Sequence, residues 1–395
     1  MLPHLLLAAS IAFSTDFEAG NIGKVEHLGD NHLQINVAGE EDQDGRNHQP
    51  SWFYVRLDGV AGRELTIDIG GLEGEYNYRK HDGSGHRNTL PSYSHDNEKW
   101  QPVDSSEWLE NPSRIRIKLR PEADRVWIAR QPPYTVSRLE KLLGEFQAHP
   151  ALSRSVAGKT VAGRPLHLLT VTDPGTPDAK KRVIWLMLRQ HSWESGTSWV
   201  GEGALRFLLS SDATARSLRR DHIFKIFPMA DPDGVARGGV RFNKFGFDIN
   251  RNWDTAEPSR MPEISAMRAA IREWLDAGRR IDLFLTVHNT ESVDYIEGPV
   301  TPGGGPMRRL TASIHEALSA RTHFHSPRGP RDSLAELPAK GRQTVNQWLY
   351  LERKIPAFLM ELMVDRNPKI GRPPLVSDRL EFGGELAQIL AEAAR

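Results

Sequence analysis

Two histidines and a glutamate in the middle of the chain have the types and the spacing that suit a metal ion. His191 and Glu194 stand three residues apart after the apolar run Val183–Leu188, so in a tight turn both side chains can point the same way. His288 follows a second apolar run, Ile281–Val287. Two histidines and one glutamate with an open fourth position form a recognised catalytic zinc set. Taken singly, His191 and Glu194 also fit a surface pair, and His288 fits a hydrogen-bonded histidine.

Polar residues follow two further apolar runs. The run Ile223–Met229 precedes Arg241 and the segment Phe247–Trp253, and the run Ile355–Met360 is followed directly by Glu361. In open α/β sheets, ligands bind outside the carboxyl ends of the strands. We therefore expect these polar groups to meet the two histidines at one edge of a sheet.

These motifs resemble the zinc carboxypeptidases and, within them, the cytosolic carboxypeptidase-like subgroup. The turn Arg189–Gly196 is similar to the zinc-binding turn of that subgroup, and Pro228–Trp253 is similar to its substrate-binding segment. The order of a His-x-x-Glu motif, an Asn-Arg-Asn-Trp block, a later His and a later Glu is highly specific. The resemblance covers about Val183–Leu362 and, on fewer residues, extends to Trp52–Arg56 and Tyr93–Asp96.

The resemblance implies a zinc hydrolase mechanism. His191, Glu194 and His288 match the ligands of one Zn²⁺ per chain, with water in the fourth position. Zinc lowers the pKa of such a water to about 7, so a nearby carboxylate can take its proton at neutral pH. Glu361 matches this general base, which then passes the proton to the leaving amine. A buried structural carboxylate is the competing interpretation of Glu361.

Four further residues match family positions that handle the substrate or orient a ligand. Arg241 matches the residue that stabilises the oxyanion. Asn250 and Arg251 match the pair that binds the terminal carboxylate, which a guanidinium can contact in a bidentate way that Lys cannot. Asp248 matches the carboxylate that accepts the free ring N–H of a zinc-bound histidine. Surface ion pairs for the two arginines and a turn cap for Asp248 are the competing interpretations.

The chain also departs from the family pattern. Members often carry a tyrosine on a mobile loop before the base, where it closes over the substrate, but Leu337–Arg342 contains none. Tyr350 is the nearest, on an expected helix. A bulky Trp193 stands inside the chelating motif, where the family commonly has Gly. Which residue replaces the closing tyrosine is left open.

The elements that position these residues divide the chain in two. The first third has short runs with apolar residues at every second position and no convincing helix, which predicts an antiparallel β-sandwich over residues 1–133. The clearest runs are His32–Val37, Trp52–Leu57, Glu64–Ile69 and Arg114–Leu119. The acidic segment Glu40–Gly45 is expected to be a solvated turn, and His81 and His86 to be surface residues.

After the Pro132–Pro133 pair, apolar strands alternate with helical patterns over residues 134–395. This alternation predicts an α/β domain with a mixed, centrally parallel sheet flanked by helices, as in the zinc carboxypeptidases. Helices are expected at Trp199–Leu209, Pro262–Leu275 and Met307–Ala320, with a last one from about Glu385 to Ala394 after two glycines.

Composition excludes several classes. The 395 residues carry 51 basic and 51 acidic side chains, so neither nucleic acid nor an anionic membrane is expected as a partner. There is no cysteine, hence no disulfide, thiolate metal site or thiol nucleophile. No apolar run approaches the ~20 residues of a membrane span.

The N-terminal segment leaves two locations open. The protein is expected to be cytoplasmic, or periplasmic or secreted if residues 1–12 act as a short signal peptide. The other interpretation of this segment is a first strand, Ile11–Phe17, that enters the fold directly.

Together these patterns predict a zinc-dependent metallocarboxypeptidase whose substrate is the C-terminus of a peptide or protein. The subgroup resemblance implies acidic, glutamate-type C-terminal residues, and Lys340, Arg342 and Arg353 near the expected pocket would suit them. One alternative is a zinc amidohydrolase acting on N-acyl amino acids. Another is a catalytically silent binding protein whose sandwich is a targeting module. The oligomeric state is left open.

Overall fold

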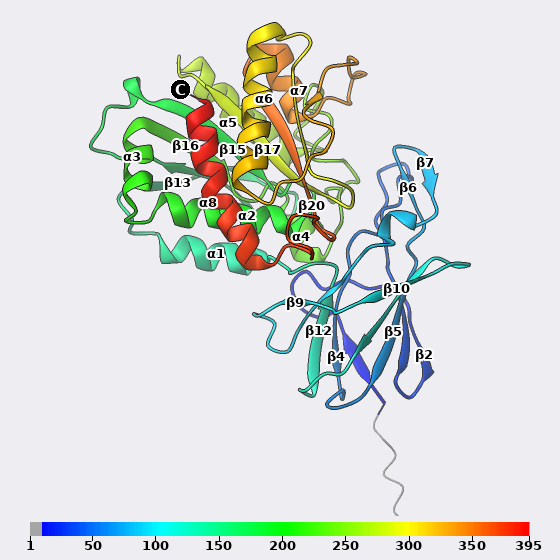
Figure 1. Cartoon of the computed structure of the whole chain (residues 1–395). Helices are drawn as coiled ribbons and strands as arrows, with labels where there is room; N and C mark the ends of the chain where they lie inside the picture. Colours follow the sequence, from blue (N-terminus) through cyan, green and yellow to red (C-terminus); the bar gives the residue numbers. More distant parts are fainter. Residues whose placement is uncertain (1–9, 395) are drawn as a thin grey trace, which may run out of the picture.

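The computed structural model describes residues 10–394, which form a β-sandwich followed by an α/β domain (Figure 1). Most of the segment considered as a signal peptide, residues 1–12, lies outside the described residues. The chain enters the sandwich at β1 (Ala12–Ser14). This strand lies within Ile11–Phe17, the segment that the sequence analysis gave as a first strand in place of a signal peptide. No helix of the described part is both long and apolar enough to cross a bilayer.

The sandwich consists of two five-stranded sheets. One has the order β1-β4-β12-β8-β9 and the other β10-β11-β5-β3-β2. The remaining bounds are β2 (Val25–Gly29), β3 (His32–Asn36), β4 (Tyr54–Asp58), β5 (Leu65–Gly70), β8 (Ser92–Ser94), β9 (Gln101–Pro102), β10 (Ser106–Leu109), β11 (Arg114–Leu119) and β12 (Arg125–Ala129). Period-two alternation places Ile115 and Ile117 of β11 in the core while its arginines face out. The pairing is antiparallel, as predicted, except between β3 and β5, which run parallel.

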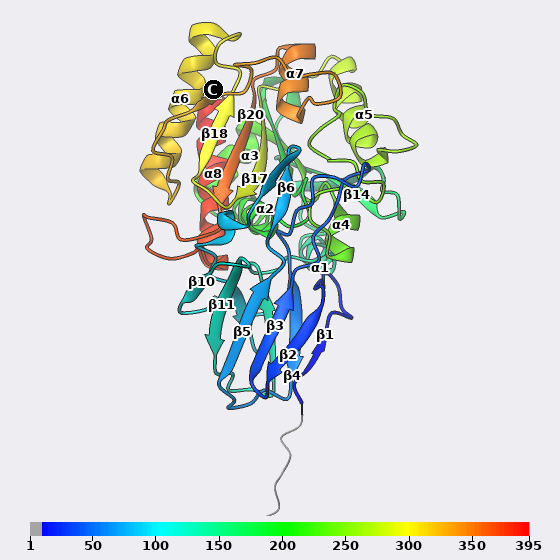
Figure 2. The same cartoon turned by 90° about the vertical axis from the view of Figure 1, so that its right-hand side faces the viewer.

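A small hairpin extends from the sandwich toward the second domain. Its strands are β6 (Gly74–Tyr76) and β7 (Arg79–His81). Figures 1 and 2 show this hairpin rising from the sandwich alongside the α/β domain. The sandwich therefore contributes residues near the carboxyl ends of the second domain's strands.

The α/β domain is built on an eight-stranded sheet of order β13-β14-β16-β15-β17-β20-β18-β19. The strands are β13 (Leu152–Lys159), β14 (Pro165–Val171), β15 (Arg182–Leu188), β16 (His222–Phe227), β17 (Leu283–Thr290), β18 (Tyr295–Gly298), β19 (Arg331–Asp332) and β20 (Ala357–Met363). The four central strands β16, β15, β17 and β20 run parallel, and β14 and β18 pair antiparallel with their outer members. The predicted mixed, centrally parallel sheet is confirmed.

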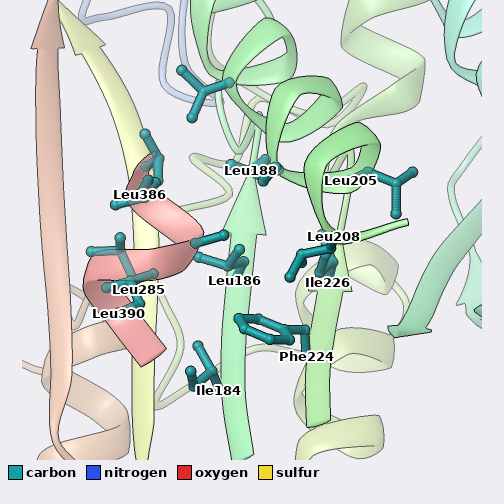
Figure 3. Packing of buried hydrophobic residues seen from close by; sticks show 14 of the residues in the cluster. Ile184, Leu186, Leu188, Leu205, Leu208, Phe224, Ile226, Leu285, Leu386 and Leu390 are labelled. Atoms are coloured by element: carbon teal, nitrogen blue, oxygen red, sulfur yellow. The ribbon is translucent and has the colours of Figure 1, made fainter. Parts of the chain in front are cut away.

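Helices cover both faces of this sheet. They are α1 (Val136–Glu145), α2 (Ser195–Leu208), α3 (Ala213–Asp221), α4 (Pro232–Arg237), α5 (Pro262–Asp276), α6 (Gly304–Arg321), α7 (Val345–Arg353) and α8 (Val376–Ala393). Leu186 and Leu188 of β15 pack toward α2 and α8, as Figure 3 shows. Trp185 and Met187 point to the opposite face, toward α5 and α7. The continuous apolar run of β15 thus reflects burial on both faces.

The last helix differs from its sequence prediction. It begins at Val376 and runs through the glycine pair that was expected to precede it. A Cβ on Gly383 would lie 2.0 Å from the carbonyl oxygen of Val200 in α2, and one on Gly203 would lie 2.0 Å from that of Leu380. These glycines are therefore required for close approach of α2 and α8 rather than for a helix start.

Two surface predictions in the sandwich are wrong in part. Within the acidic segment, Glu41 and residues 43–45 are exposed and the chain turns there, as predicted, but Glu40 and Asp42 are largely buried. Asp42 accepts hydrogen bonds from Asn47 and from two backbone N–H groups of its own loop. His86 is only 3% exposed, whereas the side chain of His81, at the end of β7, is 38% exposed. The burial of Glu40, Asp42 and His86 depends on tertiary packing, which composition alone does not reveal.

Candidate active site

The turn that carries the first two metal-ligand candidates is held by a buried arginine. Arg189, directly after β15, has a positive φ of 58°. Its Nε and Nη2 donate to the carbonyl oxygen of Ser192 at 2.9 and 2.7 Å, and its Nη1 donates to Ser198 Oγ at 3.0 Å. These bonds close the chain into a tight turn between β15 and α2. The turn brings His191 and Glu194 to the same side, as the spacing predicted.

The three predicted ligands meet in one buried cluster. The donor atoms of His191, Glu194 and His288 all lie within 4.8 Å of one another. His191 Nδ1 is 2.7 Å from one Glu194 oxygen, His288 Nδ1 is 3.0 Å from the other, and the two ring nitrogens are 3.3 Å apart. Burial raises the pKa of Glu194, but the two histidines outweigh it and lower that pKa to about 2. The carboxylate is therefore ionised.

Hydrogen bonds on the far side of each ring set its tautomer. His191 donates from Nε2 to Asp248 Oδ1 at 3.1 Å. His288 Nε2 lies 3.2 Å from Gln190 Oε1, which also accepts from Thr286 Oγ1 at 2.6 Å. With the protons on both Nε2 atoms, the Nδ1 lone pairs face the cluster.

A divalent cation stabilises such a cluster, because it binds the lone pairs of the two Nδ1 atoms and the charge of the carboxylate. The donor set, two imidazole nitrogens and one carboxylate, is that of catalytic zinc. The residues present therefore fit the metal that the sequence predicts. Among the described residues, this is the one group of histidine and acidic side chains with such geometry.

Glu361 lies beside the cluster on the neighbouring strand. The structure pairs His288 of β17 with Glu361 of β20 in parallel register, and both residues lie within their strands rather than after them. Oε2 of Glu361 is buried and has no hydrogen-bond partner among the residues that the structure describes. Burial, reinforced by the charge of Glu194, raises its pKa well above the usual value. A carboxylate with these properties is suited to exchange protons.

Asp248 links the metal ligands to Arg241. Its Oδ2 accepts from Arg241 Nε at 2.7 Å, while its Oδ1 accepts from His191. Burial raises the pKa of Asp248, but the positive charges of Arg241 and His191 hold it well below its usual range. The Nη groups of Arg241 make no hydrogen bond to any residue between 10 and 394, so they are available to a ligand.

Asn250 and Arg251 follow on the same segment but differ in their surroundings. Arg251 is half-buried and donates from Nη1 to the carbonyl oxygen of Asn250 at 2.8 Å, which leaves its other N–H groups free for a ligand. Asn250 is 1% exposed. Its Oδ1 accepts from Val345 N at 3.1 Å, and its Nδ2 lies 3.2 Å from His288 Nε2. In this structure the Asn250 amide supports neighbouring elements, whereas the half-buried Arg251 keeps N–H groups without a partner among the described residues.

The basic residues expected around the pocket are dispersed. Arg342 lines a pocket with Arg241 and Asp248, and it donates to Asn77 of the β6–β7 hairpin at 3.2 Å. Lys340 is exposed and is not among the residues lining that pocket. Arg353, on α7, pairs with Asp276 and Glu352 instead. Tyr350, the nearest tyrosine in sequence, is buried in α7.

Several residues of the site were not identified from the sequence. Gln190 and Thr286 fix the tautomer of His288, and β18 brings Tyr295 opposite Glu361 and places Glu297 two residues further on, on the same face. The alternation of an apolar Ile296 between the polar-tipped Tyr295 and Glu297 was the sequence signal that could have indicated a half-buried strand here, and the structure does bury Ile296 in the core. Their pairing with β20 depends on strand order, which spacing does not give.

Comparison with known proteins places this geometry in a family. The family model described as Zinc carboxypeptidase matches residues 139–369, and the model described as Cytosolic carboxypeptidase N-terminal domain matches residues 13–130. A metallo-carboxypeptidase from Burkholderia cenocepacia has the same fold, with a TM-score of 0.83 at 24% identity, over 97% of this chain and 99% of that one.

Sequence relatives point the same way. Cytosolic carboxypeptidase 6 of Mus musculus is 28% identical over 294 residues, which are 70% of this chain and 53% of that protein. Cytosolic carboxypeptidase 1 of Homo sapiens is 27% identical over 312 residues, 69% of this chain and 25% of that protein. The chain thus spans about a quarter to a half of the length of these two relatives.

The chain belongs to the zinc carboxypeptidase family and is by class a metallocarboxypeptidase with an intact His191, Glu194 and His288 zinc-binding triad. Its N-terminal domain and its relatives are those of the cytosolic carboxypeptidases, so the predicted subgroup is confirmed.

Proposed function

We propose that this protein releases the C-terminal residue of peptides or proteins by hydrolysis at the His191–Glu194–His288 zinc site. The observation that carries the proposal is the register of β17 and β20, which sets an unpartnered, protonatable carboxylate, Glu361, beside the ligand His288. Such a carboxylate next to a three-ligand metal site is the minimum that hydrolysis by an activated water requires.

The residues around the triad divide the chemical work. When bound, zinc supplies Lewis acidity to the scissile carbonyl and acidifies the attacking water. Glu361 takes the proton of that water and delivers it to the leaving nitrogen. Arg241, with its Nη groups unoccupied by described residues, donates hydrogen bonds to the developing oxyanion. Asp248 holds His191 in the tautomer that presents Nδ1.

Arg251 is assigned to the substrate's terminal carboxylate. Its guanidinium is half-buried, so a carboxylate there would be partly desolvated and could be contacted in a bidentate way. Asn250 assists from the adjacent position, either by direct contact after a change of its amide partner or through its bond to α7. A peptide whose C-terminus is amidated would lose this interaction.

Acidic C-terminal residues are the substrates we favour. Arg342 supports this preference because it lines the pocket next to Arg241 and bears no ion pair with the described residues. Glu297 favours a second candidate, a basic C-terminal residue, because it lies two positions from Tyr295 on the same face of β18 and its charge acts on Arg251. The two candidates make opposite predictions.

A panel of peptides that differ only in their last residue tests the proposal. Release of C-terminal Glu, Lys, Leu and Phe is measured by mass spectrometry, with an amidated peptide as control. Faster release of Glu than of Lys supports the acidic preference, and the reverse order supports the second candidate. Activity that a chelator abolishes and Zn²⁺ restores assigns the hydrolysis to the triad.

The same assay separates two rival functions. Faster hydrolysis of an N-acyl aspartate than of any peptide would identify an amidohydrolase, although the match of residues 13–130 to the cytosolic carboxypeptidase N-terminal domain favours the peptidase. Zinc binding without turnover of any substrate, unchanged by Glu361→Gln, would identify a silent binding protein.

A further inference from the structure

Glu40 of the β-sandwich bonds to the catalytic domain through three successive amides. Its Oε2 accepts from the backbone N–H groups of Val240, Arg241 and Phe242 at 2.9, 2.5 and 2.9 Å. Its Oε1 accepts from Nη2 of Arg237. The side chain is 17% exposed, so these bonds lie largely out of water. Hydrogen bonds to an ionised acceptor are roughly twice as strong as neutral ones.

Local backbone geometry prepares this anion site. Helix α4 is capped by Gly238, whose φ of 69° reverses the chain, so that the N–H of Gly239 bonds back to Gly234 and those of residues 240–242 face Glu40. At Gly239 a Cβ would lie 3.0 Å from Glu40 Oε1, so a side chain there would crowd the carboxylate. Three N–H groups that would otherwise lack acceptors are thereby satisfied by one residue from the other domain.

The segment held by Glu40 carries two links to the metal site. The carbonyl oxygen of Val240 accepts from the N–H of Trp193, inside the turn that bears the ligands. The side chain of Arg241 donates to Asp248, which in turn accepts from the ligand His191. Glu40 is therefore bonded to the backbone of the very residue that faces the oxyanion.

Domain docking does not depend on Glu40 alone. Asn21 Nδ2 donates to the carbonyl oxygen of Gly238 at 2.7 Å, and Ala19 N donates to that of Ala236 at 3.2 Å. The buried Arg130–Asp365 pair joins the domains at another place. What Glu40 adds is restraint of residues 240–242, since no other described side chain accepts from their N–H groups.

We propose that Glu40 is a positioning residue that aligns Arg241 for catalysis, so the N-terminal domain completes the active site of the α/β domain. This inference rests on the proposed role of Arg241. A misplacement of about 1 Å of a catalytic group can cost about 10²-fold in rate, so a restraint on its backbone has kinetic consequences.

The test compares Glu40→Ala, Glu40→Gln, Arg241→Ala and the double variant Glu40→Ala/Arg241→Ala in the zinc-loaded full chain. Glu41→Gln, an exposed neighbour, is the matched control. Hydrogen–deuterium exchange of the amides of residues 240–242 is measured for every variant. The kcat and KM are measured on the peptide that the wild-type protein cleaves fastest.

We expect Glu40→Ala to accelerate exchange at residues 240–242 and to lower kcat about tenfold with KM within about twofold. Glu40→Gln keeps one acceptor oxygen and should give a smaller change in the same direction, which also serves if the alanine variant does not fold. In the Arg241→Ala background, Glu40→Ala should lower kcat no further. Glu41→Gln should match the wild type in both measurements.

Three results overturn the inference alone. The first is unchanged exchange at residues 240–242 in both Glu40 variants, and the second is an equal loss of kcat from Glu40→Ala with and without Arg241. The third is unchanged kcat in the Glu40 variants while Arg241→Ala lowers it. If Arg241→Ala itself leaves kcat unchanged, the proposed role of Arg241 fails first, and the inference falls with it.

Discussion

Arg130 of the β-sandwich and Asp365 of the α/β domain form an ion pair across the domain boundary, with Nη1 3.1 Å from Oδ1 and Nη2 3.4 Å from Oδ2. Their side chains are 1% and 4% exposed. A buried charge that loses its partner is strongly destabilising, whereas replacing both charges by apolar groups is often neutral.

Arg130→Met is therefore expected to lower the free energy of unfolding by about 3 kcal/mol, because it leaves the Asp365 carboxylate buried and unpaired. The double variant Arg130→Met/Asp365→Leu should recover most of this loss. Urea denaturation measures both. Arg125→Met removes an exposed pair with Asp58 and should cost less than about 1 kcal/mol. Equal effects at the two sites would contradict the argument.

Glu361→Gln should lower kcat by about 10³-fold or more, because base and proton donor are lost together. The substitution is nearly isosteric and leaves the triad intact, so bound zinc, measured by elemental analysis, should stay at one per chain. Glu385→Gln on α8, which removes a partly exposed ion pair with Arg321, is the control and should leave kcat unchanged. Retention of wild-type kcat in Glu361→Gln would exclude Glu361 as the base.

Arg251→Lys should raise KM by about tenfold or more with a smaller effect on kcat, since an ammonium cannot replace the bidentate contact of a guanidinium. The measurement is steady-state kinetics on a free and an amidated form of one peptide. The variant should discriminate less between the two forms than the wild type does. An undiminished preference for the free carboxylate would place the terminal carboxylate elsewhere.

Asp248→Asn should weaken zinc binding by about 10-fold to 100-fold, because the ring N–H of His191 loses an ionised acceptor. Competition with a chromophoric chelator measures this affinity directly and needs no substrate. Asp254→Asn, a nearby carboxylate that is bonded to Gly341 instead, is the matched control. Equal zinc affinity in Asp248→Asn and the wild type would show that Asp248 does not support the ligand.

His86 should make the sandwich sensitive to acid. Burial, with the charge of Arg130 adding to it, lowers the pKa of His86 to about 3, while an unfolded histidine has a pKa of about 6.5. Below pH 6.5 the unfolded chain therefore binds a proton that the folded chain does not. The stability due to this residue is full above pH 6.5 and is lost as the pH falls toward 3.

At pH 5 this difference amounts to about 2 kcal/mol, a value that follows from 1.36 kcal/mol per pKa unit. His86→Leu should remove it, so the variant's Tm should fall less between pH 7 and pH 5 than that of the wild type. His27→Gln on the exposed strand β2 is the control. The same fall in Tm for His86→Leu and the wild type would contradict the assignment.

Sequence patterns predicted the fold where one physical cause dominates. Apolar runs such as Val183–Leu188 are buried on both faces whatever their neighbours, and alternation in Arg114–Leu119 defines a half-buried strand. The last helix was predicted too short because a glycine pair signals either a break or a close helix contact. Only the packing of Gly383 against α2 distinguishes the two.

Residue types and their spacing were enough to identify the chemistry available at the site: His191, Glu194 and His288 as a zinc set, with Glu361, Asp248 and Arg241 named around them. Which of these groups meet depends on how the strands and the two domains pack. Strand order put Glu361 beside His288 and Tyr295 opposite Glu361, and domain docking brought Glu40 to the backbone of Arg241. Such contacts join residues up to 201 positions apart. They depend on the packing of whole domains, which the local spacing of residues does not reveal.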